Sequence, residues 1–97
     1  MYWATTILRT TGWSQESADA LAAWKAHIEQ RHPLVREVRC YRALGGTQVV
    51  WQEGFDTFED YAVLANEVDD VCDVVMGAVF AHEVPGTRDG GIWADGV

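Results

Sequence analysis

The segment between Ser14 and Pro33 constrains the fold of this chain more than any other stretch. It carries a stripe with the 3.6-residue period of a helix, and Trp24 lies beside that stripe. Ser14 can cap the helix, and Pro33 ends it because proline disfavours helical geometry at the preceding residue. The stripe consists of Ala18, Leu21, Lys25, Ile28 and His32.

Four other segments have the β-branched and aromatic composition of strands. They are residues 3–10, 35–43, 47–55 and 78–84. The sequence Leu44-Gly45-Gly46-Thr47 predicts a hairpin between the second and third of them. Pro85-Gly86 ends the fourth, which leaves residues 85–97 as a glycine-rich tail anchored by Trp93.

A second helix is predicted to start at Asp56, with Glu59 three residues further on, as in a capping box. We expect it to break near Asn66 and to continue for a turn or two towards Val75. The resulting order is β-α-β-β-α-β, which predicts an α+β, ferredoxin-like fold with a four-stranded antiparallel sheet and both helices on one face. The apolar stripe consists of Phe58, Tyr61, Ala62, Ala65 and Val68.

The 97 residues are enough for one domain, so we expect residues 1–97 to form a single unit. The predicted strands are apolar on both faces, as Val49, Val50 and Trp51 in succession illustrate. A sheet with one wet face should alternate between apolar and polar residues, and two helices cover only one face. We therefore predict a homodimer in which two sheets face each other as a dimeric α/β barrel.

Charge and hydropathy exclude several partners. The chain has 7 basic and 15 acidic residues, a net charge of −8, which disfavours nucleic acid and anionic membranes. The N-terminus lacks the features of a signal peptide, and the longest apolar run, residues 74–81, is too short to span a bilayer. Cys40 and Cys72 are expected to be reduced, buried thiols in a cytoplasmic protein.

Histidine and tyrosine supply the candidate catalytic residues. His32 lies on the helical stripe, where it either stabilises the helix C-terminus or acts as an acid or base in a cavity. His82 in the predicted fourth strand and Tyr61 in the second helix are either satisfied core residues or groups that orient a substrate. His27 is expected at the surface. No histidine or cysteine spacing resembles a metal site, so neither a metal nor another cofactor is expected.

Aromatic residues supply the candidate substrate-binding surface. Trp3, Trp24, Trp51 and Phe80 could line a pocket for a flat aromatic ligand, although core packing explains Trp24 equally well. No nucleophile motif and no phosphate-binding loop is present.

Three segments resemble the dimeric α/β-barrel superfamily, in particular EthD-like and antibiotic-biosynthesis-monooxygenase-like proteins. These are residues 32–35 (HPLV) after Trp24, the pair Tyr41-Arg42, and residues 51–59 (WQEGFDTFE). The resemblance spans residues 2–84 and implies the fold more strongly than the reaction. Only His32 carries over as a family position. No histidine lies between Phe55 and Ala81, which argues against the haem-degrading branch.

The resulting hypothesis is a cofactor-independent enzyme that acts on a hydrophobic, aromatic or polyketide-like small molecule in secondary metabolism or aromatic catabolism. Its reaction would be that of a cyclase, dehydratase, isomerase or monooxygenase, because a pocket with one acid–base group suits proton transfer. The alternatives are a non-catalytic protein that binds a ligand in the same pocket and a structural dimer that has no cavity.

Overall fold

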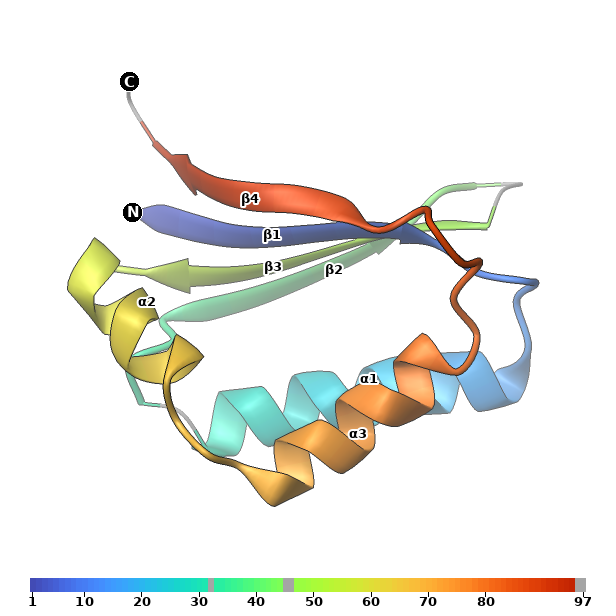
Figure 1. Ribbon diagram of the computed structural model, residues 1–97, viewed down its shortest axis with the longest axis horizontal. Coiled ribbons are helices and arrows are strands. Elements are labelled where there is room, and N and C mark those ends of the chain that lie inside the picture. The colour runs from blue at the N-terminus through green and yellow to red at the C-terminus, as the bar shows by residue number, and fades with distance from the viewer. Residues whose placement is uncertain (32, 45–46, 96–97) are drawn as a thin grey trace.

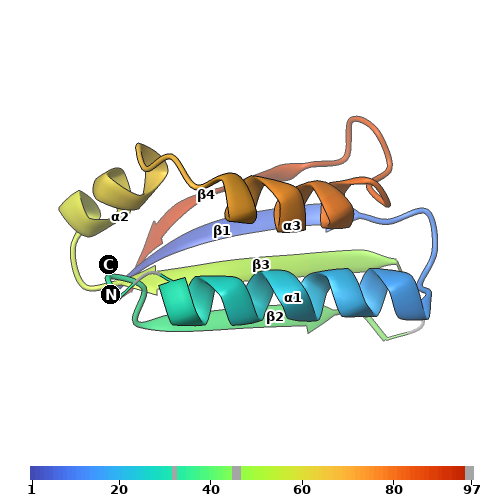
Figure 2. The ribbon, with the colours of Figure 1, turned by 90° about the horizontal axis from the view of Figure 1, so that it is seen from below.

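The computed structural model describes residues 1–31, 33–44 and 47–95. Four strands form one antiparallel sheet in the order β2-β3-β1-β4, and helices α1 and α3 lie against one of its faces (Figures 1 and 2). This arrangement confirms the predicted ferredoxin-like α+β fold. In chain order the elements are β1 (Tyr2–Arg9), α1 (Gln15–Arg31), β2 (Glu37–Arg42), β3 (Gln48–Phe55), α2 (Phe58–Ala65), α3 (Asp70–Phe80) and β4 (Asp89–Ala94).

The hydrophobic core lies between the sheet and the two long helices. Strand alternation turns Leu8, Val49 and Trp51 towards the helices, and α3 contributes Val79. The first helix begins as predicted, because the Ser14 Oγ accepts a hydrogen bond from the Ser17 backbone amide at 3.2 Å. The full set of buried core residues is Leu8, Leu21, Trp24, Ile28, Val38, Val49, Trp51 and Val79.

Helix α2 starts one residue later than predicted. Its N-cap is Thr57, whose Oγ1 accepts a hydrogen bond from the Asp60 amide at 3.1 Å. The Asp56 carboxylate instead lies 3.4 Å from the guanidinium of Arg36. None of the residues of α2, all of which the structure describes, is buried, and Phe58 is 51% exposed. The helix therefore closes one end of the sheet (Figure 1) rather than covering its face.

The predicted strand at 78–84 is wrong. Helix α3 runs to Phe80, and its N-cap Asp69 accepts a hydrogen bond from the Cys72 amide at 3.0 Å. A capped helix start followed by an apolar run satisfies the backbone locally, so the β-branched residues of this segment remain helical. Only an isolated bridge between Thr10 and Glu83 connects the end of the predicted strand to the end of β1.

The fourth strand lies instead within the predicted tail. Strand β4 pairs with β1 from Tyr2 opposite Ala94 to Ile7 opposite Asp89. Gly90 has φ +143°, and a Cβ at this position would collide with the carbonyl oxygen of Thr5. The glycine that made this segment look like a tail is therefore what allows the strand to lie against β1.

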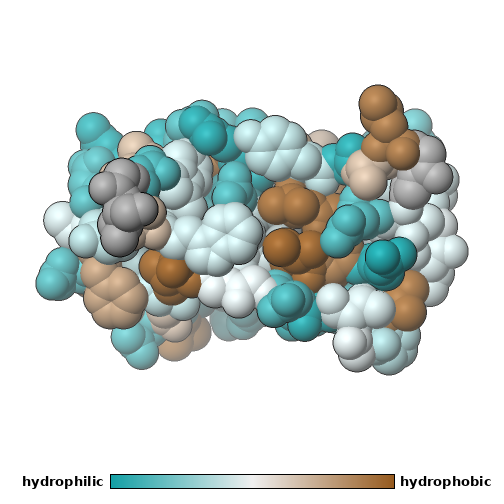
Figure 3. Space-filling model, turned by 90° about the horizontal axis from the view of Figure 1, so that it is seen from above, coloured by the Kyte–Doolittle hydropathy of each residue, from teal (hydrophilic) through white to brown (hydrophobic). Residues whose placement is uncertain are grey.

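Among the described residues, no helix lies over the other face of the sheet (Figure 1). Trp3 lies on this side, where the Arg39 guanidinium stacks 4.3 Å from its ring centroid and its indole donates to the Asp95 carboxylate at 3.0 Å. A hydrophobic patch lies near the middle of this open face (Figure 3). Tyr41 and Trp93 are 51% and 52% exposed.

Candidate functional site

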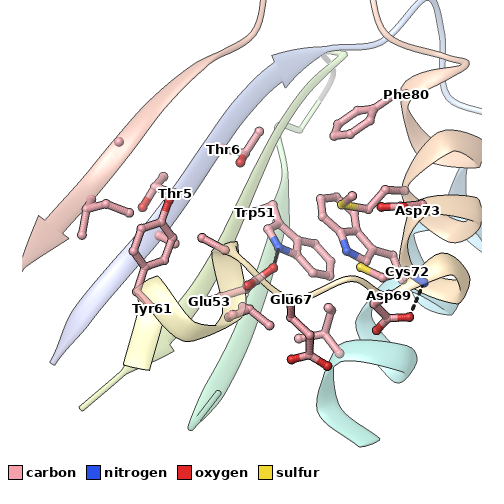
Figure 4. A pocket seen from close by; sticks show the side chains of 18 residues that line it. Thr5, Thr6, Trp51, Glu53, Tyr61, Glu67, Asp69, Cys72, Asp73 and Phe80 are labelled. Atoms are coloured by element: carbon pink, nitrogen blue, oxygen red, sulfur yellow. Dashed lines mark hydrogen bonds between the residues drawn. The ribbon is translucent and has the colours of Figure 1, made fainter. Parts of the chain in front are cut away.

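A cavity of about 470 Å³ lies between the sheet and the helices (Figure 4). This volume lies within the range of small-molecule sites, so the sequence-based alternative of a fold without a cavity is wrong. The lining residues come from all three helices, from β1, β3 and β4, and from the segment between α2 and α3. Those with a part in the argument are Trp24, Trp51, Glu53, Tyr61, Asp69, Cys72, Asp73 and Phe80.

Two tryptophans form the floor of this cavity. The rings of Trp24 on α1 and Trp51 on β3 are stacked, with centroids 3.8 Å apart and planes inclined by 5°. Phe80 packs edge-on against Trp24, with a centroid distance of 5.7 Å. The three aromatic side chains thus form one wall of the cavity.

Tyr61 lies across the cavity from α3 (Figure 4). Its ring packs edge-on against Phe55 at a centroid distance of 5.7 Å, which holds helix α2 to the end of β3. The structure thus brings together four of the residues predicted from the sequence: Trp24, Trp51, Tyr61 and Phe80.

The other predicted site residues are not brought together there. Trp3 is not among the described residues that line the cavity, since it lies on the open face of the sheet. His82 lies in the turn after α3, where its Nε2 is 4.0 Å from the carboxylate of Glu16 on α1. His32 lies outside the described residues.

Glu53 is a cavity residue that the sequence reasoning missed. Its Oε1 accepts a hydrogen bond of 2.8 Å from the Trp51 indole, so the carboxylate lies beside the aromatic floor (Figure 4). Glu53 follows Trp51 by two residues in the same strand, and residues two apart share a face. Strand alternation was therefore the signal that could have identified it.

Further carboxylates surround the cavity. Glu67, Asp69 and Asp73 line it together with Glu53. Their charge disfavours a ligand that carries a carboxylate or a phosphate and suits a neutral or protonated one.

One corner of the cavity contains the Cys72 thiol, and the Asp69 carboxylate beside it contacts the imidazole of His27. Asp69 Oδ2 lies 2.9 Å from His27 Nε2, and the side chain of His27 is only 16% exposed, so the expected surface position is wrong. Burial, followed by the charges of Asp69, Glu53 and Asp73, raises the pKa of the Cys72 thiol to about 11. Cys40 and Cys72 are both free thiols, and both are half-buried rather than fully buried as expected.

The chain has the ferredoxin-like fold found in antibiotic biosynthesis monooxygenases, as its order of elements and its antiparallel sheet show. It is similar to a variant of SnoaB, a cofactor-independent oxygenase from Streptomyces nogalater. The TM-score is 0.77 and the identity 14%, over 99% of this chain and 93% of that one.

Two further structures extend the comparison. The ActVA-Orf6 monooxygenase of Streptomyces coelicolor, in complex with nanaomycin D, has a TM-score of 0.70 at 10% identity over 96% of this chain and 85% of that one. A dimeric protein of unknown function from Bacteroides fragilis has a TM-score of 0.64 at 11% identity over 95% and 94%. The EthD-like part of the expected resemblance finds no support in these structures.

At the level of sequence, no protein-family model and no curated protein matches the chain. Within residues 1–31, 33–44 and 47–95, no helix is long and apolar enough to cross a membrane.

Proposed function

We propose that this protein is a monooxygenase-type enzyme that oxidises an electron-rich aromatic small molecule in secondary metabolism without an organic cofactor. The observation that carries the proposal is the Glu53 carboxylate, hydrogen-bonded at 2.8 Å to the indole of Trp51 in the floor of the 470 Å³ cavity. Cofactor-independent oxygenases among the structures with the same fold support this choice of reaction.

The chemistry requires a base and a flat hydrophobic surface. A planar substrate would lie on the Trp24–Trp51 floor, and Glu53 would remove an acidic proton from it. The resulting electron-rich anion can then react with O₂. For a CH₂ group between two aryl rings, the balance is CH₂ + O₂ → C=O + H₂O, so oxygen is the sole oxidant. Tyr61 would orient a substrate oxygen across the cavity.

An anthrone is a suitable test substrate because it is planar and carries such a CH₂ group. We expect quenching of tryptophan fluorescence on binding, and enzyme-dependent oxygen uptake at an oxygen electrode. Glu53→Gln should lower turnover roughly 100-fold or more while the dissociation constant changes little, because the amide oxygen can still accept the Trp51 hydrogen bond.

Glu59→Gln is the matched control, since Glu59 is an exposed carboxylate in the first turn of α2. It should retain wild-type turnover. Full turnover by Glu53→Gln would remove Glu53 from the mechanism. Tight binding of anthrone and of nanaomycin D without oxygen uptake would instead favour the second candidate, a protein that binds such a ligand without converting it.

His32 remains a second candidate for the acid–base role, as the sequence predicts. Comparison of His32→Gln with Glu53→Gln in the same oxygen-uptake assay would assign that role. We expect the larger loss of turnover from Glu53→Gln. A larger loss from His32→Gln would assign the role to the histidine.

We also propose that the enzyme is a homodimer joined through the open face of the sheet. Half-exposed Tyr41 and Trp93 on this face support the proposal, as does the dimeric Bacteroides fragilis protein of the same fold. Light scattering should give twice the chain mass at micromolar concentration. Val50→Glu on this face should shift the mass towards one chain, whereas Val63→Glu on α2 should not. A wild-type monomer would contradict the proposal.

A further inference from the structure

Three potential metal ligands meet beside the cavity, and two of them, Asp69 and Cys72, line it. His27 comes from α1, Asp69 is the N-cap of α3, and Cys72 lies in the first turn of α3. One donor atom from each residue lies within 4.8 Å of the other two. The imidazole, carboxylate and thiol come from segments separated by about forty residues, so no local spacing motif could have revealed them.

The start of α3 fixes two of these residues relative to each other. The Asp69 Oδ1 accepts the Cys72 amide at 3.0 Å, which leaves Oδ2 directed to His27 Nε2 at 2.9 Å. Figure 4 shows Asp69 and Cys72 together at the edge of the cavity. The cap therefore fixes the carboxylate, and the first helical turn fixes the position of the thiol.

The donor set suits a divalent transition metal. Zn²⁺ takes nitrogen, oxygen and sulfur ligands at about 2.0–2.3 Å in tetrahedral geometry, which places neighbouring donor atoms roughly 3.3–3.7 Å apart. The His27 and Asp69 donor atoms lie 2.9 Å apart, and all three donor atoms lie within 4.8 Å of one another, so the present distances bracket these separations. Soft thiolate and imidazole ligands select zinc, cobalt or copper over magnesium or calcium.

The surroundings also favour a cation. The carboxylates of Glu53, Asp69 and Asp73 line the same cavity as Cys72, and their negative charges stabilise a bound cation.

A nearby indole provides a second, independent observation. Trp24 is 3% exposed, and its Nε1 finds no hydrogen-bond acceptor among the described residues. The indole and Cys72 line the same cavity, and the Cys72 side chain packs against the core cluster that contains Trp24. A metal-bound thiolate is a stronger acceptor than a thiol, so metal binding would give this buried donor a partner.

We propose that His27, Asp69 and Cys72 form a binding site for a divalent transition metal, with Zn²⁺ the best match to the three donors. Asp69 and Cys72 line the cavity, so a fourth coordination position faces the ligand space. This arrangement corresponds to an open site with three protein ligands rather than a closed structural one. The site is independent of the proposed oxygenase reaction, because its test measures metal binding and not turnover.

Titration of chelator-treated protein with Co²⁺ gives the clearest measurement. We expect one ion per chain, visible d–d absorption of tetrahedral intensity and a sulfur-to-cobalt charge-transfer band in the near ultraviolet. Zn²⁺ should displace the cobalt and abolish both absorptions. Calorimetric titration with Zn²⁺ alone should give the same stoichiometry.

Variants with matched controls assign the ligands. Cys72→Ser should abolish the charge-transfer band, whereas Cys40→Ser should retain it. His27→Gln should weaken binding at least tenfold, whereas His82→Gln should not. Asp69→Asn should also weaken binding, and it leaves the helix capped because asparagine is as good an N-cap as aspartate.

Two results would overturn the proposal. One is wild-type protein that binds neither Co²⁺ nor Zn²⁺ at micromolar concentration, and the other is a charge-transfer band that survives Cys72→Ser. If Cys72→Ser fails to fold, the His27→Gln and His82→Gln pair decides, because equal affinity of these two variants would exclude His27 as a ligand.

Discussion

The indole rings of Trp24 and Trp51 lie almost parallel, with centroids 3.8 Å apart. One ring comes from the first helix and the other from the third strand, so the pair joins α1 to the centre of the sheet. Both residues are almost fully buried, and both border the cavity. The same contact therefore stabilises the core and shapes the floor of the candidate site.

Trp51→Ala should lower the free energy of unfolding by about 3–5 kcal/mol, because it removes a large buried ring and leaves a void beside Trp24. Urea unfolding followed by circular dichroism measures the change. Phe58→Ala is the control, since Phe58 is 51% exposed, and its cost should be about 1 kcal/mol or less. Equal costs for the two variants would show that the stacked pair is not part of the core.

Gly90→Ala should destabilise the fold by at least about 1–3 kcal/mol, because the residue has φ +143° and its new methyl group would meet the Thr5 carbonyl. Gly91→Ala is the matched control in the same strand. Its Cβ would lie 3.7 Å from the Trp93 indole, an ordinary contact. Thermal unfolding of both variants tests the position of β4, and a neutral Gly90→Ala would contradict it.

Thr57→Ala should cost about 1 kcal/mol, because it removes the side chain that accepts the Asp60 amide at the start of α2. Asp56→Ala should cost less, since its ion pair with Arg36 is exposed on both sides. The urea concentration at the unfolding midpoint of each variant shows which of the two residues contributes more to stability. The reverse order would assign the cap to Asp56, as the sequence pattern first indicated.

Cys72 should make stability fall at alkaline pH in metal-free protein. The unfolded thiol has a pKa near 9.0, whereas the folded thiol keeps its proton until about pH 11. Between these values the folded state binds more protons, so stability falls as pH rises through this window, and the effect is absent below it.

The measurement is urea unfolding at about pH 8 and about pH 10 in the presence of a chelator. The measurement is made in the Cys40→Ser variant. Burial also raises the pKa of the Cys40 thiol, which would otherwise add its own pH dependence. Adding Cys72→Ala to this background should flatten the pH dependence. An identical fall with and without Cys72 would assign the effect to other groups.

Local patterns predicted the first three strands, the first helix and the start of the second with errors of one or two residues. Hydrophobic period, the Ser14 cap and the limits imposed by Pro33 act over a few residues, so they can be read without the tertiary structure. The same patterns indicated a sheet with two apolar faces and an aromatic cavity that includes Trp24, Trp51, Tyr61 and Phe80.

The region after Asp69 could not be predicted in this way. Its apolar, β-branched residues suit either a helix or a strand, and a glycine-rich segment suits either a tail or a strand. Tertiary contacts select between these alternatives. The first segment is a helix because α3 packs against α1, and the second is a strand because β4 pairs with the free edge of β1.

The sequence by itself determined the fold class, because hydrophobic periodicity and element order are local properties of the chain. The tertiary structure decided which strand completes the sheet and which polar groups meet. Glu53 approaches the aromatic floor, and His27 approaches Asp69 and Cys72, only because β3, α1 and α3 pack around the same cavity. Contacts between residues so far apart depend on how whole elements pack, and no local pattern encodes that packing.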